Sequence, residues 1–131
     1  MLGPEEAARF HGHKGPFLAW GYRAARLAEE VLRPSGLKSL VCRARLPLRT
    51  PFTCILDGVQ AGSRCTLGKG NLKVEDGERI ELSFECGERK LVIRPAINLE
   101  ELGQREDMEE AFYRVLSMPE RDLFEVVVYG Q

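Results

Sequence analysis

The chain has 131 residues, of which 44% are hydrophobic and 30% charged, and its formal net charge at pH 7 is -1. This length and composition predict one globular domain, residues 1–131, that buries its own core. The near-zero charge argues against a nucleic-acid-binding protein, and no apolar run approaches the roughly 20 residues that span a bilayer, which argues against a membrane protein.

The N-terminus and the cysteine content bear on the cellular compartment. No signal-peptide pattern follows Met1, so we expect a cytoplasmic protein whose four cysteines stay reduced. Asn and Gln together number five, whereas Arg and Glu are abundant. That composition favours a heat-adapted source, a thermophile.

The first part of the chain passes from helical to extended patterns. A short helix is expected over 4–10, with Phe10 pointing inward. Apolar residues then recur every three or four positions, which predicts an amphipathic helix over 17–33. Residues 38–48 alternate between apolar and polar side chains and predict a half-buried strand. Pro47 indicates that this strand lies at a sheet edge or ends there.

The rest of the chain mixes helices and short strands. A helix over 51–61 is expected to start at Thr50-Pro51, with Thr as N-cap and Pro at the first position. Tight hairpin turns are expected at Asp76-Gly77 and Gly87-Glu88. The other predicted elements are three strands, a helix and a last strand: 71–75, 79–86, 89–95, 106–116 and 122–129. Without regular βαβ alternation, the predicted class is α+β, a single domain with a mixed or antiparallel sheet packed against two or three helices.

The four cysteines separate into two kinds. Cys42 and Cys86 fall on the apolar faces of alternating strands, where cysteine packs as a small hydrophobic residue. Cys54 and Cys65 lie beside glycine- and threonine-rich turns, outside any apolar periodicity. Cys54 is expected in the first turn of its helix, where free N–H groups favour a thiolate, and Asp57 follows one turn later on the same face. We interpret Cys54 and Cys65 as candidate metal ligands; burial in the core is the alternative for both.

The two histidines of the chain, His11 and His13, stand two residues apart. In an extended segment this spacing points both imidazoles the same way, so they can chelate one ion; a structural role is the alternative. Imidazole with thiolate suits zinc, or another divalent transition metal. Two His and two Cys would form a closed structural site. Three ligands would leave a position for a substrate, with Asp57 as a base or as a partner of a ligand.

A glycine-rich loop at residues 66–71 follows Cys65. It does not match the P-loop pattern, but its backbone N–H groups and Lys69 could hold an anion. The alternative is a tight glycine turn that leads into the next strand.

Two segments carry a family resemblance: F-H-G-H-K-G-P-F-L-A-W-G-Y-R-A-A at 10–25 and P-F-T-C-I-L-D-G-V-Q-A-G-S-R-C-T-L-G-K-G-N-L at 51–72. Through them the chain resembles the FmdE family, which is named for formylmethanofuran dehydrogenase, in a short form without the C-terminal zinc module of some relatives. The resemblance implies an α+β domain that pairs as a homodimer. It also implies a metal, zinc first, surrounded by the residues at matching positions: His11, His13, Cys54, Asp57 and Cys65, with Gln60 and Lys69 nearby. At the first motif, Gly15 stands where many relatives have a cysteine.

Four functions are compatible with these patterns. The first is a small cytoplasmic metal-binding protein, accessory to one-carbon or molybdenum/tungsten metabolism. The second is a metal-dependent hydrolase or lyase acting on a small anionic substrate, with Asp57 as the catalytic base and Lys69 gripping the anion. The third is a structural partner protein in which the glycines only tighten turns. The fourth is an exposed reactive thiol without a metal.

Overall fold

The computed structural model describes residues 1–130, which contain six helices and five strands. The helices are α1 (Pro4–His11), α2 (Pro16–Leu32), α3 (Cys54–Gly62), α4 (Leu99–Arg105), α5 (Met108–Ser117) and α6 (Glu120–Leu123). The strands are β1 (Val41–Leu46), β2 (Leu72–Asp76), β3 (Glu81–Cys86), β4 (Arg89–Pro95) and β5 (Phe124–Tyr129). The strands form one mixed sheet in the order β2-β1-β3-β4-β5, so the predicted α+β class is confirmed.

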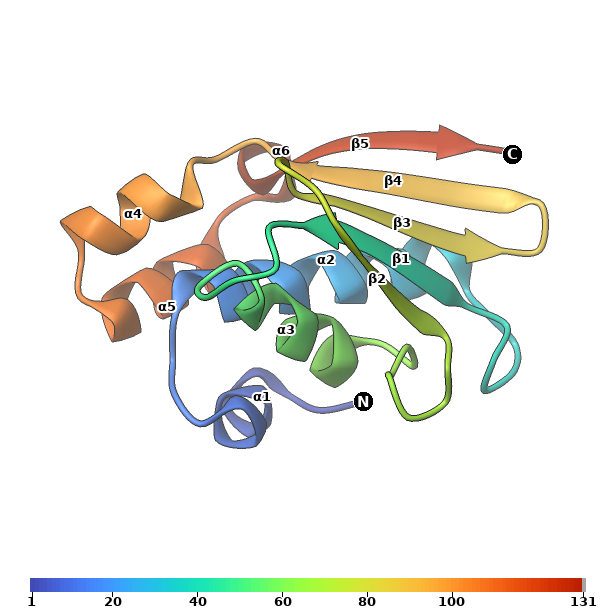
Figure 1. Ribbon diagram of the computed structural model, residues 1–131, viewed down its shortest axis with the longest axis horizontal. Coiled ribbons are helices and arrows are strands. Elements are labelled where there is room, and N and C mark those ends of the chain that lie inside the picture. The colour runs from blue at the N-terminus through green and yellow to red at the C-terminus, as the bar shows by residue number, and fades with distance from the viewer. Residues whose placement is uncertain (131) are drawn as a thin grey trace.

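The main helices cover one side of this sheet (Figure 1). Helix α2 runs beneath the strands, α3 lies beside it, and α1 lies farther from the sheet. The core between the layers contains the fully buried side chains of Trp20, Phe84 and Phe112. The Trp20 indole N–H donates a hydrogen bond of 2.9 Å to the carbonyl of Leu123, which satisfies its polar group inside the core. Within residues 1–130, no helix combines the length and the apolarity that crossing a bilayer requires.

Strand β1 shows how the alternating pattern positions the sheet. Alternate side chains from Cys42 to Leu46 are buried against the helices, whereas Arg43 and Arg45 are exposed on the opposite face. The two arginines form ion pairs with Glu85 and Glu75 on the neighbouring strands, at 3.1 and 3.3 Å. β1 lies inside the sheet, between β2 and β3. Of the two interpretations of Pro47, the edge position is therefore wrong, and the strand ends at the residue before it.

The two predicted hairpins have different outcomes. The turn at Gly87-Glu88 is confirmed, because Cys86 pairs with Arg89 in an antiparallel register and Gly87 adopts a φ of 62°. The hairpin at Asp76-Gly77 is wrong. β2 pairs with β1 in a parallel register, and β3 pairs with the other edge of β1, so the chain passes across β1 between them. A local turn pattern does not reveal that a third strand lies between its flanking strands.

The start of α3 also differs from the prediction. The helix begins at Cys54 rather than at Pro51, although Cys54 does lie in its first turn. The preceding residues form tight turns: the Cys54 N–H donates to the carbonyl of Pro51 at 3.0 Å, and the Ile55 N–H to that of Phe52 at 3.1 Å. These bonds span three residues instead of the four of an α-helix, which delays the helix start.

The ends of the chain account for the remaining differences. Phe10 does not point inward: it is 53% exposed, because α1 presents Ala7 and Ala8 to the rest of the protein. The helices α4 and α6 were not predicted. The start of α4 carries a recognisable signal, since the side chain of Asn98 accepts a hydrogen bond of 3.0 Å from the Glu101 N–H.

Helices α2 and α3 cross with their backbones in close contact, and glycines make this approach possible. A Cβ on Gly58 would overlap the Leu18 carbonyl oxygen and lie 2.6 Å from the Tyr22 nitrogen. A Cβ on Gly21 would overlap the Ile55 carbonyl. Backbone atoms cannot move aside as a flexible side chain can, so no larger residue fits at this crossing without separating the helices.

We therefore expect Gly58→Ala to lower the free energy of unfolding by about 1–3 kcal/mol, the usual cost of overpacking. The matched control is Gly103→Ala in α4, where the added Cβ would only meet the Pro16 Cγ at 3.7 Å. That control should leave stability unchanged or raise it by up to ~1 kcal/mol, because alanine is the better helix former. Urea unfolding monitored by circular dichroism measures both changes, and equal stability of the two variants would contradict the close crossing.

Candidate metal centre

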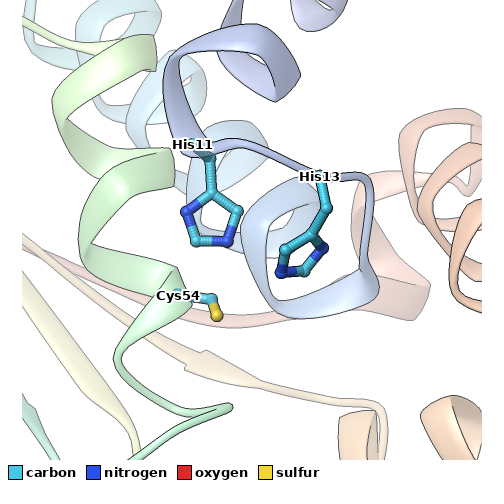
Figure 2. Close-up of side chains that lie close together, drawn as sticks. All are labelled: His11, His13 and Cys54. Atoms are coloured by element: carbon cyan, nitrogen blue, oxygen red, sulfur yellow. The ribbon is translucent and has the colours of Figure 1, made fainter.

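Three potential metal ligands come together from two separated segments. His11 is the last residue of α1, His13 lies in the connection to α2, and Cys54 is the first residue of α3. One donor atom from each lies within 4.8 Å of the other two. Figure 2 shows the two imidazoles and the cysteine side chain directed toward a common space. The sequence prediction that the histidine segment meets Cys54 agrees with this arrangement.

The turn after α1 explains how both histidines reach the same place. Gly12 ends the helix with a φ of 108°, a left-handed conformation that glycine adopts without the steric cost of a Cβ. Its N–H donates to the carbonyl of Ala8 at 2.8 Å. The chain therefore reverses directly after His11, and the two imidazole centroids lie 4.6 Å apart.

His11 is oriented by a carboxylate. Its Nδ1 lies 2.6 Å from Oδ2 of Asp57, and Gln60 Nε2 donates to the other Asp57 oxygen at 3.3 Å. Because an ionised carboxylate only accepts hydrogen bonds, Nδ1 must carry the proton, and in the neutral ring Nε2 keeps its lone pair. A metal-binding histidine commonly has a carboxylate on its other nitrogen, which fixes the ring and raises its basicity.

The opposite nitrogen of His11 supplies a direct test of whether a metal fits. Nε2 is buried and has no hydrogen-bond partner among the described residues. A buried polar atom without a partner is costly, and native proteins seldom leave one. A metal ion bound to Nε2 would give this nitrogen a partner. With His13 and Cys54 as its other ligands, the ion would have nitrogen and sulfur donors of the kind that zinc prefers. The residues present therefore fit a divalent transition metal.

The Cys54 thiol differs from the sequence expectation in its acidity. Burial raises its pKa, and the nearby Asp57 carboxylate raises it further, while a backbone N–H at the start of the helix lowers it less. The expected thiolate stabilisation by the helix terminus is therefore outweighed. In the metal-free protein the thiol is protonated at neutral pH, and metal binding would displace that proton.

Cys65 does not join the other candidate ligands. It is fully buried in the core, and its Sγ lies 3.4 Å from the carbonyl oxygen of Leu40. Burial raises the pKa of this thiol to about 11. The core alternative therefore describes Cys65 better than metal ligation does. Of the two strand cysteines, Cys42 is fully buried and Cys86 is half-buried.

The glycine loop is held as a tight turn. Lys69 Nζ donates to Thr66 Oγ1 at 2.9 Å. The buried side chain of Asn71 accepts from the Thr66 N–H at 2.9 Å and donates to the Leu40 carbonyl at 3.0 Å. The Leu67 N–H donates to Gln60 Oε1 at 3.1 Å. Since these groups already have partners within the protein, the turn alternative fits better than an anion cradle, and Gln60 connects the loop to Asp57.

Two features beside the site were not anticipated. Lys14 Nζ donates to the Tyr113 hydroxyl at 2.7 Å and to Glu109 at 3.3 Å, and it pairs with Glu5 at 3.3 Å, which ties α1 and α5 to the histidine segment. Glu109 and Tyr113 lie 95 and 99 residues from Lys14 in sequence, so no local pattern predicts these contacts. A cavity of about 280 Å³ also adjoins the site, with His13 and Cys54 among its walls.

Comparison with models of protein families identifies a family that covers most of the chain. The family model described as "FmdE, Molybdenum formylmethanofuran dehydrogenase operon" matches residues 10–125. This range contains the histidine segment, the whole of α3 and the strands β1 to β4. No match was found among curated proteins.

If Asp57 holds His11 for a metal, Asp57→Asn should weaken zinc binding about 10–100-fold, the usual effect of removing such a carboxylate. The matched control is Asp76→Asn at the end of β2, an exposed position away from the site. Competition with a coloured chelator measures the affinity of each variant. An unchanged affinity for Asp57→Asn would show that the carboxylate does not support a metal ligand.

Proposed function

The chain belongs to the FmdE family, and from that premise we propose that it is a small cytoplasmic metal-binding protein, accessory to one-carbon or molybdenum/tungsten metabolism. The family's description refers to a molybdenum formylmethanofuran dehydrogenase operon, which supports the metabolic context. The observation that carries metal binding is the buried, unpartnered Nε2 of His11, on the opposite side of the ring from its carboxylate partner. The four free cysteines are compatible with a reducing compartment.

Zinc is the proposed ion. Two imidazole nitrogens and one thiolate form a donor set of intermediate softness, which suits zinc in a tetrahedral site. Three protein ligands leave the fourth position open, where a bound zinc ion would act as a Lewis acid toward a ligand. The protein's own contribution is to fix the His11 ring through Asp57 and to hold Cys54 at the start of α3.

A metal-dependent hydrolase or lyase is the second candidate. The open fourth position and the adjoining cavity favour it. The assignment of Asp57 as base is less favourable, because its carboxylate already accepts hydrogen bonds from His11 and Gln60. Lys69 is bound to Thr66 and is less suited to grip an anion. The contacts of both residues thus support a positioning role more than a catalytic one.

The roles of Cys54 and Cys65 can be separated by metal content. Cys54→Ala should abolish stoichiometric zinc binding, because it removes the only sulfur donor in the three-residue cluster. Cys65→Ala should retain one zinc per chain, because that thiol lies in the core beside Leu40. Elemental analysis of the purified proteins measures both, with circular dichroism as the check on folding. Loss of zinc from a folded Cys65→Ala protein would restore Cys65 to the ligand set and overturn the proposed one.

We also propose that the protein is a homodimer that pairs through β5. This strand is at the edge of the sheet, and Val126, Val127 and Tyr129 are exposed on it. An apolar edge strand is prone to pair with another chain.

In sedimentation analysis, Val127→Lys should convert the dimer to a monomer by placing a charge in the interface. Leu67→Lys, at an exposed apolar position of the glycine loop, is the control and should remain dimeric. A wild-type chain that sediments as a monomer would contradict the proposed pairing.

A further inference from the structure

The residues that line the cavity beside the metal site restrict the kind of ligand that it can bind. Its volume is about 280 Å³, and His13 and Cys54 form part of its wall. The remaining wall is mainly apolar and includes Phe17 at the start of α2, Leu99 in α4 and Met108 in α5. It therefore offers a metal at one point and apolar contact around it.

We propose that this cavity binds a small molecule with an apolar body and one monoanionic donor group, a thiolate or a carboxylate, that occupies the fourth position on the metal. The inference rests on the proposed function, since it requires the ion held by His11, His13 and Cys54. It identifies the class of ligand that this site selects.

The charge of the site favours a single negative group. A divalent ion with two neutral imidazoles and one thiolate carries a net charge of +1, and the Asp57 carboxylate on the far side of the His11 ring offsets part of that charge. The coordination sphere therefore takes up one further negative group at most. Charge that stays unbalanced beside apolar walls is costly. No Lys or Arg is among the described residues that line the cavity, and its one acidic residue, Glu100, is exposed. A second anionic group on the ligand would find no cationic side chain on the cavity wall, which disfavours phosphate esters and dicarboxylates.

The volume restricts the apolar body. A protein cavity of about 150 Å³ already holds benzene, so the present cavity accommodates one six-membered ring with a short side chain. It lies just below the range of roughly 300–1,000 Å³ that is typical of sites for larger ligands. The ligand is therefore a compact molecule rather than a nucleotide or an extended cofactor.

Gly103 provides a way to fill the cavity without altering a metal ligand. It lines the cavity from α4, and a Cβ built on it would meet only the Pro16 Cγ, at an ordinary contact distance of 3.7 Å. A leucine at this position would extend into the space of the ligand. The matched control is Gly68→Leu in the glycine loop, where an added Cβ has no neighbour within 4 Å and which does not line the cavity.

The experiment uses the full chain loaded with zinc, or with cobalt as a spectroscopic substitute. Calorimetry compares phenylacetate with acetate, and phenylmethanethiol with 2-mercaptoethanol. We expect the aromatic member of at least one pair to bind at least tenfold more tightly than its small analogue, and to shift the cobalt absorption bands as its donor enters the coordination sphere. The pair that binds more tightly identifies the donor as carboxylate or thiolate.

Gly103→Leu should lower the affinity for the aromatic probe at least tenfold and leave the metal content at one ion per chain. Gly68→Leu should change neither the affinity nor the metal content. Equal affinity of aromatic and small probes in the wild-type protein would overturn the inference and leave metal binding intact. Equal affinity of the aromatic probe for metal-loaded and metal-free protein would also overturn it. A wild-type protein that takes up no metal would overturn the proposed function and this inference together.

Discussion

The close crossing of α2 and α3 is the constraint on which the site depends. Gly21 and Gly58 have no side chain at the contact, so the two helix backbones touch. Cys54 and Asp57 lie on the same helix as Gly58, at its N-terminal end, and the depth of the crossing sets their position relative to the end of α1. The hydrogen bond of 2.6 Å between Asp57 and His11 requires that position. A packing feature of the core thus determines the geometry of the polar site.

Much of the fold follows from local patterns in the sequence. Alternation identified β1 and β3, and the helical period identified α2 and α5, because each buries one face against the core. The order of the strands in the sheet could not be predicted from local sequence patterns. The parallel pairing of β1 with β2 joins residues about thirty positions apart through α3, and the turn residues at 76–77 are equally compatible with a hairpin. Strand order depends on such long-range pairing.

The site was predictable from polar and metal-ligating residues that do not fit the apolar pattern of a helix or a strand. His11, His13 and Cys54 stood outside every apolar pattern, and the structure brings these three together. Cys65 also lies outside every apolar pattern, but in the structure its glycine-rich neighbours form a tight turn beside the buried thiol. That turn is held by Asn71, whose amide binds backbone groups of four separate residues. Only tertiary contacts distinguish the two cysteines, since the segment that covers Cys65 precedes it by 25 residues.

The two imidazoles of the site are held with unequal rigidity. His11 is mostly buried and fixed by Asp57, while His13 is exposed, and no hydrogen bond within residues 1–130 restrains its ring. If an ion binds here, His11 would already be oriented toward it by Asp57. His13 would have to lose its rotational freedom on binding, so ordering of that one ring would cost part of the free energy of metal binding.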